Sequence, residues 1–218
     1  MNNETIHIVL TILQKEVKTF QVPIVTLVAE RTRDPFRVLI STMLSLRTKD
    51  DVTTVASRKL FDKATTPEAM LRLSEAKIQK LIYPVGFYKT KAKNIRAACR
   101  ILLEEYDGRV PDDLDRLIAL PGVGRKTANL VVTLGFGKPG ICVDTHVHRI
   151  TNRFGYVKTK TPDQTETALR EKLPRKWWIP VNDILVAYGQ GLCTPISPWC
   201  SKCRVEGYCE KINVDKKR

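Results

Sequence analysis

The sequence predicts an all-α fold built from two helical domains, and three observations support this prediction. Apolar residues recur at the three- and four-residue spacing of a helix through most of the 218 residues. Helix-capping residues and early prolines stand at the starts of these segments. Short apolar runs such as "GICV" occur, but no alternating strand pattern and no hairpin signal accompanies them. We therefore expect helices joined by short turns.

The first 20 residues are predicted to form an amphipathic helix. Glu4 comes early, and no basic stretch precedes an uninterrupted apolar core, so the segment is unlike a secretory signal. No apolar run reaches the length of about 18 residues that a membrane-spanning helix needs. We expect a protein without a membrane segment, located in the cytoplasm and associated with the nucleoid.

The next helices are indicated by their capping residues. Thr66 is a predicted N-cap followed by Pro67 at the first helical position, and Ser74 caps a second helix that ends before Pro84. A long helix is then predicted over residues 89–106. Its apolar face consists of Ala92, Ile95, Cys99, Leu102 and Leu103. Its cationic stripe, which is a solvated face or a phosphate-facing surface, consists of Lys89, Lys93, Arg96 and Arg100.

The segment "PDDLDRLIAL" predicts a short helix, and "PGVG", residues 121–124, leads from it into a further helix that ends at Gly135. Glycine permits positive φ and close backbone approach, while the unpaired N–H groups at the start of a helix favour an anion. This composition is typical of a helix-hairpin-helix that grips a nucleic-acid phosphate, and an ordinary interhelical turn can have it too. "GKPG", residues 137–140, is the predicted domain boundary.

Lys126 falls in the first turn of the helix after the glycines. The positive end of a helix dipole disfavours an ammonium group, and a neutral amine is what nucleophilic attack requires. Lys126 is therefore a candidate nucleophile, the alternative being a solvated lysine. Asp144 precedes the helix of "VDTHVHRITNR", where it is an N-cap or a carboxylate paired with Lys126. His146 and His148 are two residues apart and point to different helix faces, so we expect no metal site there.

Four of the six cysteines lie within 17 residues with the spacing C-x6-C-x2-C-x5-C. They are Cys193, Cys200, Cys203 and Cys209. Four thiolates so close together can wrap one compact centre, and by ligand type zinc and an iron–sulfur cluster are equally suitable. The remaining two, Cys99 and Cys142, are expected to be buried small apolar residues.

The charge of the chain points to a polyanionic partner. Lys and Arg number 37 against 23 Asp and Glu, which gives a formal net charge of +14. A positive field of this size favours nucleic acid, with an anionic membrane surface or simple solubility as alternatives.

Together, "LPGVGRKTANLVV", "VDTHVHR", "GFYKTKAKNI" and the cysteine spacing resemble the endonuclease III family of helix-hairpin-helix DNA glycosylases. The resemblance extends from "DPFRVLISTMLS" to Cys209. It implies a six-helix domain over residues 29–138 and a second domain of residues 1–28 and 139–218 that holds a [4Fe–4S] cluster. It also implies a monomer that binds double-stranded DNA, with a damaged base or an abasic site, in a cleft between the domains.

The resemblance further implies a bifunctional enzyme of base excision repair. Lys126 would be the nucleophile that forms a Schiff base with the deoxyribose, and Asp144 its acidic partner. The enzyme would remove oxidised or damaged pyrimidines and cleave the strand by β-elimination. Relatives without this lyase step have another residue in place of Lys126.

Residues matching the family's DNA contacts are Arg47, Phe87, Leu120, Gly122, Val123, Gly124, Arg125, His146 and Arg149. Among them Arg47 and Phe87 match the side chains that fill the gap left in the duplex. Bacterial relatives usually have glutamine where Arg47 stands, and a leucine is familiar where Phe87 stands. The first cysteine loop, "TPISPW", lacks the basic residues common there, so its phosphate contacts are expected at Lys202 and Arg204.

Two alternatives remain open at the level of sequence. One is a thymine- or uracil-mismatch DNA glycosylase, which would use the same fold on other bases. The other, from a different class, is a non-catalytic DNA-binding module whose cysteines hold zinc.

Overall fold

The computed structural model describes residues 1–17, 25 and 34–218. Over these residues the chain forms helices and turns with no β-strand, which confirms the all-α prediction. Within the same ranges, no helix combines the length and the apolar character needed to cross a membrane. The chain divides into two compact units, Met1–Val22 with Pro139–Arg218, and Pro23–Lys138. The predicted boundary between residues 28 and 29 lies outside the described residues.

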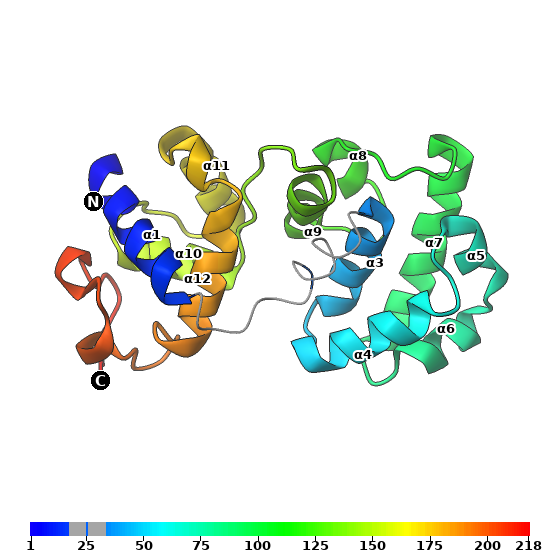
Figure 1. Ribbon diagram of the computed structural model, residues 1–218, viewed down its shortest axis with the longest axis horizontal. Coiled ribbons are helices and arrows are strands. Elements are labelled where there is room, and N and C mark those ends of the chain that lie inside the picture. Colours follow the sequence, from blue (N-terminus) through cyan, green and yellow to red (C-terminus); the bar gives the residue numbers. More distant parts are fainter. Residues whose placement is uncertain (18–24, 26–33) are drawn as a thin grey trace. The chain divides into compact units, whose positions relative to one another are not determined.

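The unit Pro23–Lys138 is organised around α3 (Pro35–Ser45), which packs against α4, α7, α9 and the π-helical turn η1 (Figure 1). The other elements are α4 (Asp50–Phe61), α5 (Pro67–Arg72), α6 (Glu75–Ile82), α7 (Tyr88–Tyr106), α8 (Leu114–Ile118), α9 (Arg125–Leu130) and η1 (Val131–Gly135). The side chains of Leu39, Ile40 and Leu44 are fully buried in its core. Burial of this apolar face accounts for the central position of α3.

The predicted caps are found where the sequence puts them. The Thr66 hydroxyl accepts a hydrogen bond from the Ala69 N–H at 3.2 Å, and the Ser74 hydroxyl accepts one from the Lys77 N–H at 3.2 Å. Such a cap satisfies one of the unpaired N–H groups at the start of a helix.

The cationic stripe of α7 requires one correction. Lys89, Lys93 and Arg100 are exposed, whereas Arg96 is half-buried and donates hydrogen bonds to the carbonyl oxygens of Leu71 and Leu73. Arg96 therefore ties down the end of α5 and does not belong to the solvated stripe. The sequence could not show this, because the acceptors are backbone atoms of another helix.

The unit Met1–Val22 with Pro139–Arg218 contains α12 (Pro180–Gly191), which packs against α1 and α10 (Figure 1). Its other elements are α1 (Asn3–Val17), α10 (Thr145–Arg153), α11 (Pro162–Lys172) and the 3-10 turns η2 (Arg175–Trp177), η3 (Cys200–Lys202) and η4 (Glu206–Tyr208). Leu10, Leu13 and Tyr188 are among its buried side chains. After α12 the chain continues mostly in turns, so this last segment is held by contacts other than a helix ladder.

Candidate active site and nucleic-acid interface

Two glycines connect α8 to α9, and they differ in backbone conformation and in what an added side chain would contact. Gly122 has φ of +79°, and a Cβ added there would lie 2.7 Å from Nδ2 and 3.0 Å from Cβ of Asn94. A side chain at this position is therefore opposed by both backbone conformation and packing. Gly124 is extended, with φ of −93°, and an added Cβ would have no atom of the protein within 4 Å. The surface beside Gly124 is thus open to another molecule.

Two buried apolar residues fix the hairpin to the core of its unit. Leu120 and Val123 are 2% and 6% exposed, and the Val123 N–H donates to the Leu120 carbonyl oxygen at 3.1 Å. Both side chains belong to the core of this unit. If these residues contact a nucleic acid, they can do so only through their backbone atoms.

Lys126 is the second residue of α9 and is half-buried. Its neighbours Thr127 and Asn129 are buried, and the helix continues through the π-helical turn to Gly135. A π-helical segment inside a helix is often found at functional sites. The lysine therefore lies two residues after Gly124, in the first turn of a helix whose other face is buried.

Asp144 is the N-cap of α10. Its Oδ1 accepts hydrogen bonds from the N–H groups of His146 at 2.8 Å and Val147 at 3.0 Å. The predicted capping role is therefore confirmed. Because Lys126 and Asp144 belong to different compact units, the pairing of their side chains stays a prediction.

His146 and Arg149 contact each other on α10. Arg149 Nη2 lies 3.1 Å from His146 Nδ1 and donates to the carbonyl oxygens of Cys193 at 2.9 Å and Gly189 at 3.3 Å. Burial lowers the pKa of Arg149 from its usual value. Part of the guanidinium thus fixes the end of α12 to α10, and the contact of both side chains with DNA stays a prediction.

The structure brings Arg47 and Phe87, which we call the wedge pair, next to each other. The Arg47 Cζ lies 5.6 Å from the centre of the Phe87 ring, and Phe87 is 63% exposed. Both have left-handed backbone, with φ of 51° and 57°. They line a pocket of about 350 Å³ whose other residues are Met43, Leu46, Thr90, Lys91, Asn94 and Gly122. The wedge pair and the hairpin glycine therefore share one surface.

Lys91 is a residue of this pocket that sequence reasoning missed. It is only 8% exposed, and its Nζ donates to the carbonyl oxygens of Leu44 at 2.7 Å and Leu46 at 2.5 Å and to the Thr48 hydroxyl at 3.2 Å. Burial lowers the pKa of Lys91 to about 8. The signal available in the sequence was its position beside Ala92, on the edge of the apolar face of α7.

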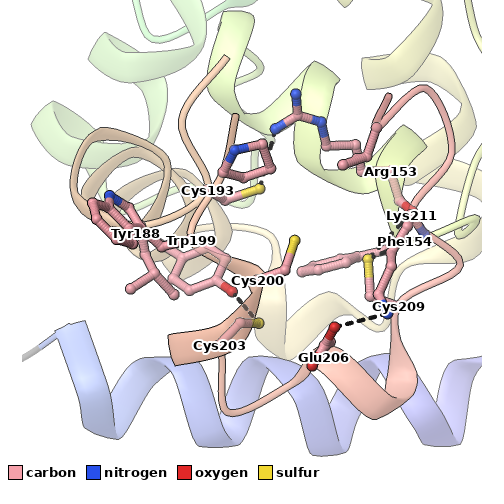
Figure 2. A pocket seen from close by; sticks show the side chains of 13 residues that line it. Arg153, Phe154, Tyr188, Cys193, Trp199, Cys200, Cys203, Glu206, Cys209 and Lys211 are labelled. Carbon is pink, nitrogen blue, oxygen red and sulfur yellow. Dashed lines mark hydrogen bonds and ion pairs between the residues drawn. The ribbon is translucent and has the colours of Figure 1, made fainter. Parts of the chain in front are cut away.

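The four clustered cysteines line one pocket, and Figure 2 shows their sulfur atoms turned toward the same space. Among the described residues, no three His, Cys, Asp or Glu side chains are placed to hold a single metal ion. By ligand type, four thiols that line one pocket can hold a [4Fe–4S] cluster, in which each thiolate binds its own iron, and they suit zinc as well.

Three groups around this pocket contact the sulfur atoms (Figure 2). Arg153 Nη1 donates to the Cys193 Sγ at 3.4 Å, the Tyr188 hydroxyl lies 2.7 Å from the Cys203 Sγ, and the Lys211 N–H donates to the Cys209 Sγ at 3.4 Å. Hydrogen bonds of this kind tune cluster thiolates. None of these three groups was predicted from the sequence.

Burial raises the pKa of the Cys203 thiol and raises that of Cys209 to about 11. These thiols on their own are therefore protonated at neutral pH. The buried guanidinium of Arg153, which is 6% exposed, supplies a positive charge beside the pocket. Arg153 can thus partly compensate the negative charge that the cysteines would carry as thiolates.

The first cysteine loop, which lacks basic residues, exposes an apolar side chain. Ile196 is 83% exposed. Lys202 and Arg204 are both exposed, and the Lys202 Nζ lies 4.6 Å from the centre of the Trp199 ring. Their contact with phosphates stays a prediction. Cys99 and Cys142 are buried, as expected.

Comparison with known proteins assigns this architecture to a family. The family model described as "HhH-GPD superfamily base excision DNA repair protein" matches residues 40–175. "Endonuclease III" of Thermotoga maritima is 51% identical over 196 residues, which cover 90% of this chain and 84% of that protein.

Two solved structures are similar over nearly their whole length. The structure described as "Structure of a Trapped Endonuclease III-DNA Covalent Intermediate: Estranged-Adenine Complex" has a TM-score of 0.85 and 31% identity, with 97% of both chains covered. "Structure of a thermostable thymine-DNA glycosylase" has a TM-score of 0.81 and 26% identity, with 96% of this chain and 97% of that chain covered.

Proposed function

Because the chain belongs to the HhH-GPD superfamily of base excision DNA repair proteins, and within it to the endonuclease III family, it is a DNA glycosylase and AP lyase, and we propose that Lys126 and Asp144 perform its chemistry. One observation carries the proposal: the glycine turn puts Lys126 at the second position of a helix, half-buried and two residues after Gly124, beside which the surface is open. An enzyme of this family is not a non-catalytic binding module, so that alternative is set aside.

The reaction begins with the neutral amine of Lys126. Its lone pair attacks C1′ of a deoxyribose flipped out of the duplex, and the C1′–N bond breaks with its electron pair leaving on the base. Loss of a proton from the nitrogen and opening of the sugar ring give a Schiff base. Removal of a C2′ proton then breaks the C3′–O bond, which cuts the strand 3′ to the sugar.

Asp144 is the acidic partner in this proposal. A carboxylate can accept the proton that Lys126 loses and stabilise the positive charge that develops on the sugar. The hydrogen bonds from the N–H groups of His146 and Val147 to its Oδ1 fix the position of this side chain at the start of α10.

The proposed substrates are oxidised or damaged pyrimidines and abasic sites in double-stranded DNA. When the base leaves the stack, the wedge pair would fill the gap, since a guanidinium and an aromatic ring can both stack on bases. The exposure of Phe87 and its contact with Arg47 support this role. Phosphate contacts from the hairpin backbone would fix the register of the duplex.

A second substrate class is favoured by one observation. A thymine-DNA glycosylase has the same fold over 97% of its chain. A panel of duplexes containing oxidised pyrimidines, thymine mismatches or uracil mismatches, with incision as the readout, separates the two classes. We expect the oxidised pyrimidines to be processed fastest.

We also propose that Cys193, Cys200, Cys203 and Cys209 hold a [4Fe–4S] cluster. When bound, the cluster supplies structural cross-linking of the last segment of the chain. Arg153 would donate to the Cys193 thiolate and compensate its charge, and the Tyr188 hydroxyl would hydrogen-bond and orient the Cys203 thiolate. A brown protein containing iron and sulfide supports this assignment, whereas a colourless zinc protein contradicts it. We expect the enzyme to act as a monomer on the chromosome in the cytoplasm.

Trapping of the covalent intermediate tests the catalytic proposal. Borohydride should link the wild-type protein to abasic DNA, and Lys126→Gln should abolish the adduct while the protein remains folded. Lys77→Gln, which removes an exposed lysine from α6, is the matched control and should be trapped like the wild type. An adduct that survives Lys126→Gln would assign the nucleophile to another residue.

A further inference from the structure

Lys91 is buried in the same pocket as the wedge pair, but its amine is engaged with the protein itself. The Nζ contacts three oxygen atoms, and an ammonium group has three N–H donors to match them. Two of the acceptors, the carbonyl oxygens of Leu44 and Leu46, lie at the end of α3, where helical carbonyls lack intrahelical partners. A cation is also favoured at that end of a helix.

The third acceptor, the Thr48 hydroxyl, connects Lys91 to the loop that bears Phe87. The Thr48 hydroxyl, which contacts Lys91, also accepts a hydrogen bond from the Gly86 N–H at 3.1 Å. Gly86 directly precedes Phe87. A Cβ added at Gly86 would lie 2.6 Å from the Arg47 carbonyl oxygen, so the two backbone segments are in close contact. The loops that bear Arg47 and Phe87 are thus held to each other through Lys91 and Thr48.

The wedge pair needs these contacts because of its backbone conformation. Arg47 and Phe87 both adopt left-handed backbone, which is unfavourable for a residue other than glycine. Such conformations persist only where the surroundings impose them. Lys91 fixes the backbone on one side of Arg47 through the Leu46 carbonyl, and the Thr48 hydroxyl fixes the other side.

We propose that Lys91, acting through Thr48, is the positioning residue that holds Arg47 and Phe87 in the geometry needed to enter damaged DNA. This inference rests on the proposed role of the wedge pair in filling the gap in the duplex. Lys91 does not touch DNA in this proposal, because its amine is committed to three protein oxygens. It acts by keeping two exposed side chains in place before DNA arrives, which lowers the ordering cost of binding.

The test compares binding of two duplexes by the full chain. One contains a tetrahydrofuran abasic-site analogue opposite 2-aminopurine, and the other is the undamaged duplex of the same sequence. For Lys91→Met we expect the affinity for the abasic duplex to fall by about tenfold or more, as small misplacements of positioned groups do. We expect affinity for the undamaged duplex to be unchanged and the 2-aminopurine fluorescence change on binding to be lost. Lys77→Met, which removes an exposed charge from α6, controls for net charge.

A second pair of variants tests the connection between the two loops. Thr48→Val should reproduce the loss of abasic preference, and Thr48→Ser, which keeps the hydroxyl, should restore it. Adding Lys91→Met to Phe87→Ala should cause little further loss, because both act through the same contact with DNA. If Lys91→Met fails to fold, the comparison of Thr48→Val with Thr48→Ser decides the question.

Three results would overturn the inference: a folded Lys91→Met that keeps wild-type preference for the abasic duplex, an equal loss for both duplexes, or additive effects with Phe87→Ala. Where Lys91→Met does not fold, wild-type preference in Thr48→Val would overturn it. These outcomes are distinct from failure of the proposed function, in which the wild type itself would show no preference for the abasic duplex and no borohydride adduct.

Discussion

The hairpin around Gly122 and the cysteine segment from Cys193 to Cys209 hold their shapes in different ways. The hairpin is built from local backbone geometry, with a positive-φ glycine, two buried apolar anchors and helices on both sides. The cysteine segment contains only two 3-10 turns and depends on side chains from other helices, among them Arg153 and Tyr188. The first can form before any ligand binds, whereas the second would be stabilised by the metal centre that we propose for it.

The largest test of this difference is loss of one cluster ligand. Cys200→Ala should abolish the brown colour and destabilise the unit that holds the cysteines by about 5 kcal/mol or more, because ligand binding contributes directly to folding. Iron analysis and thermal unfolding by circular dichroism measure both effects. Cys142→Ala, a buried cysteine outside the pocket, should keep its iron. Full iron content and unchanged stability in Cys200→Ala would contradict the assignment.

A smaller loss is expected on the hairpin side from Gly122→Ala. The backbone conformation and the contact with Asn94 both oppose a Cβ, so unfolding free energy should fall by about 2 kcal/mol. Urea denaturation measures the change. A variant as stable as the wild type would show that the turn is not held by this glycine.

Gly124→Ala tests whether the second glycine of the hairpin serves DNA binding and not stability. Its φ suits any residue and its surroundings are open, so stability should change by less than about 0.5 kcal/mol. The added methyl group would stand where a phosphate approaches, and affinity for duplex DNA should fall by roughly tenfold, about 1.4 kcal/mol. Fluorescence anisotropy with labelled duplex measures this. Loss of stability together with retained affinity would reverse our interpretation of the two glycines.

The smallest effect concerns Lys91, whose side chain holds backbone segments together near the hairpin. The pKa of Lys91 is lowered to about 8 by burial, below the value of about 10.4 expected in the unfolded chain. Between pH 8 and pH 10 the unfolded state binds more protons at this residue, so raising the pH favours the folded state. Relative to Lys91→Met, the wild type should gain about 1 kcal/mol from pH 8 to pH 9. Denaturation curves at both pH values test this, and a constant difference would contradict it.

The sequence by itself determined the features that depend on near neighbours. Helix starts at Thr66, Ser74 and Asp144 were predictable because a capping side chain bonds an N–H group two or three residues away. The glycine turn, the position of Lys126 and the spacing of the cysteines are likewise local, which is why the all-α class and the family could be inferred from them.

Only the tertiary structure decided which polar side chains are committed to the protein. Lys91 bonds a carbonyl oxygen 47 residues away, and Arg153 bonds carbonyl oxygens 41 and 42 residues away. Arg96 belongs to the same group, since its acceptors are backbone atoms of another segment. Periodicity cannot identify such partners, because backbone carbonyls carry no residue-specific signal and become acceptors only when packing brings a helix end beside a buried donor.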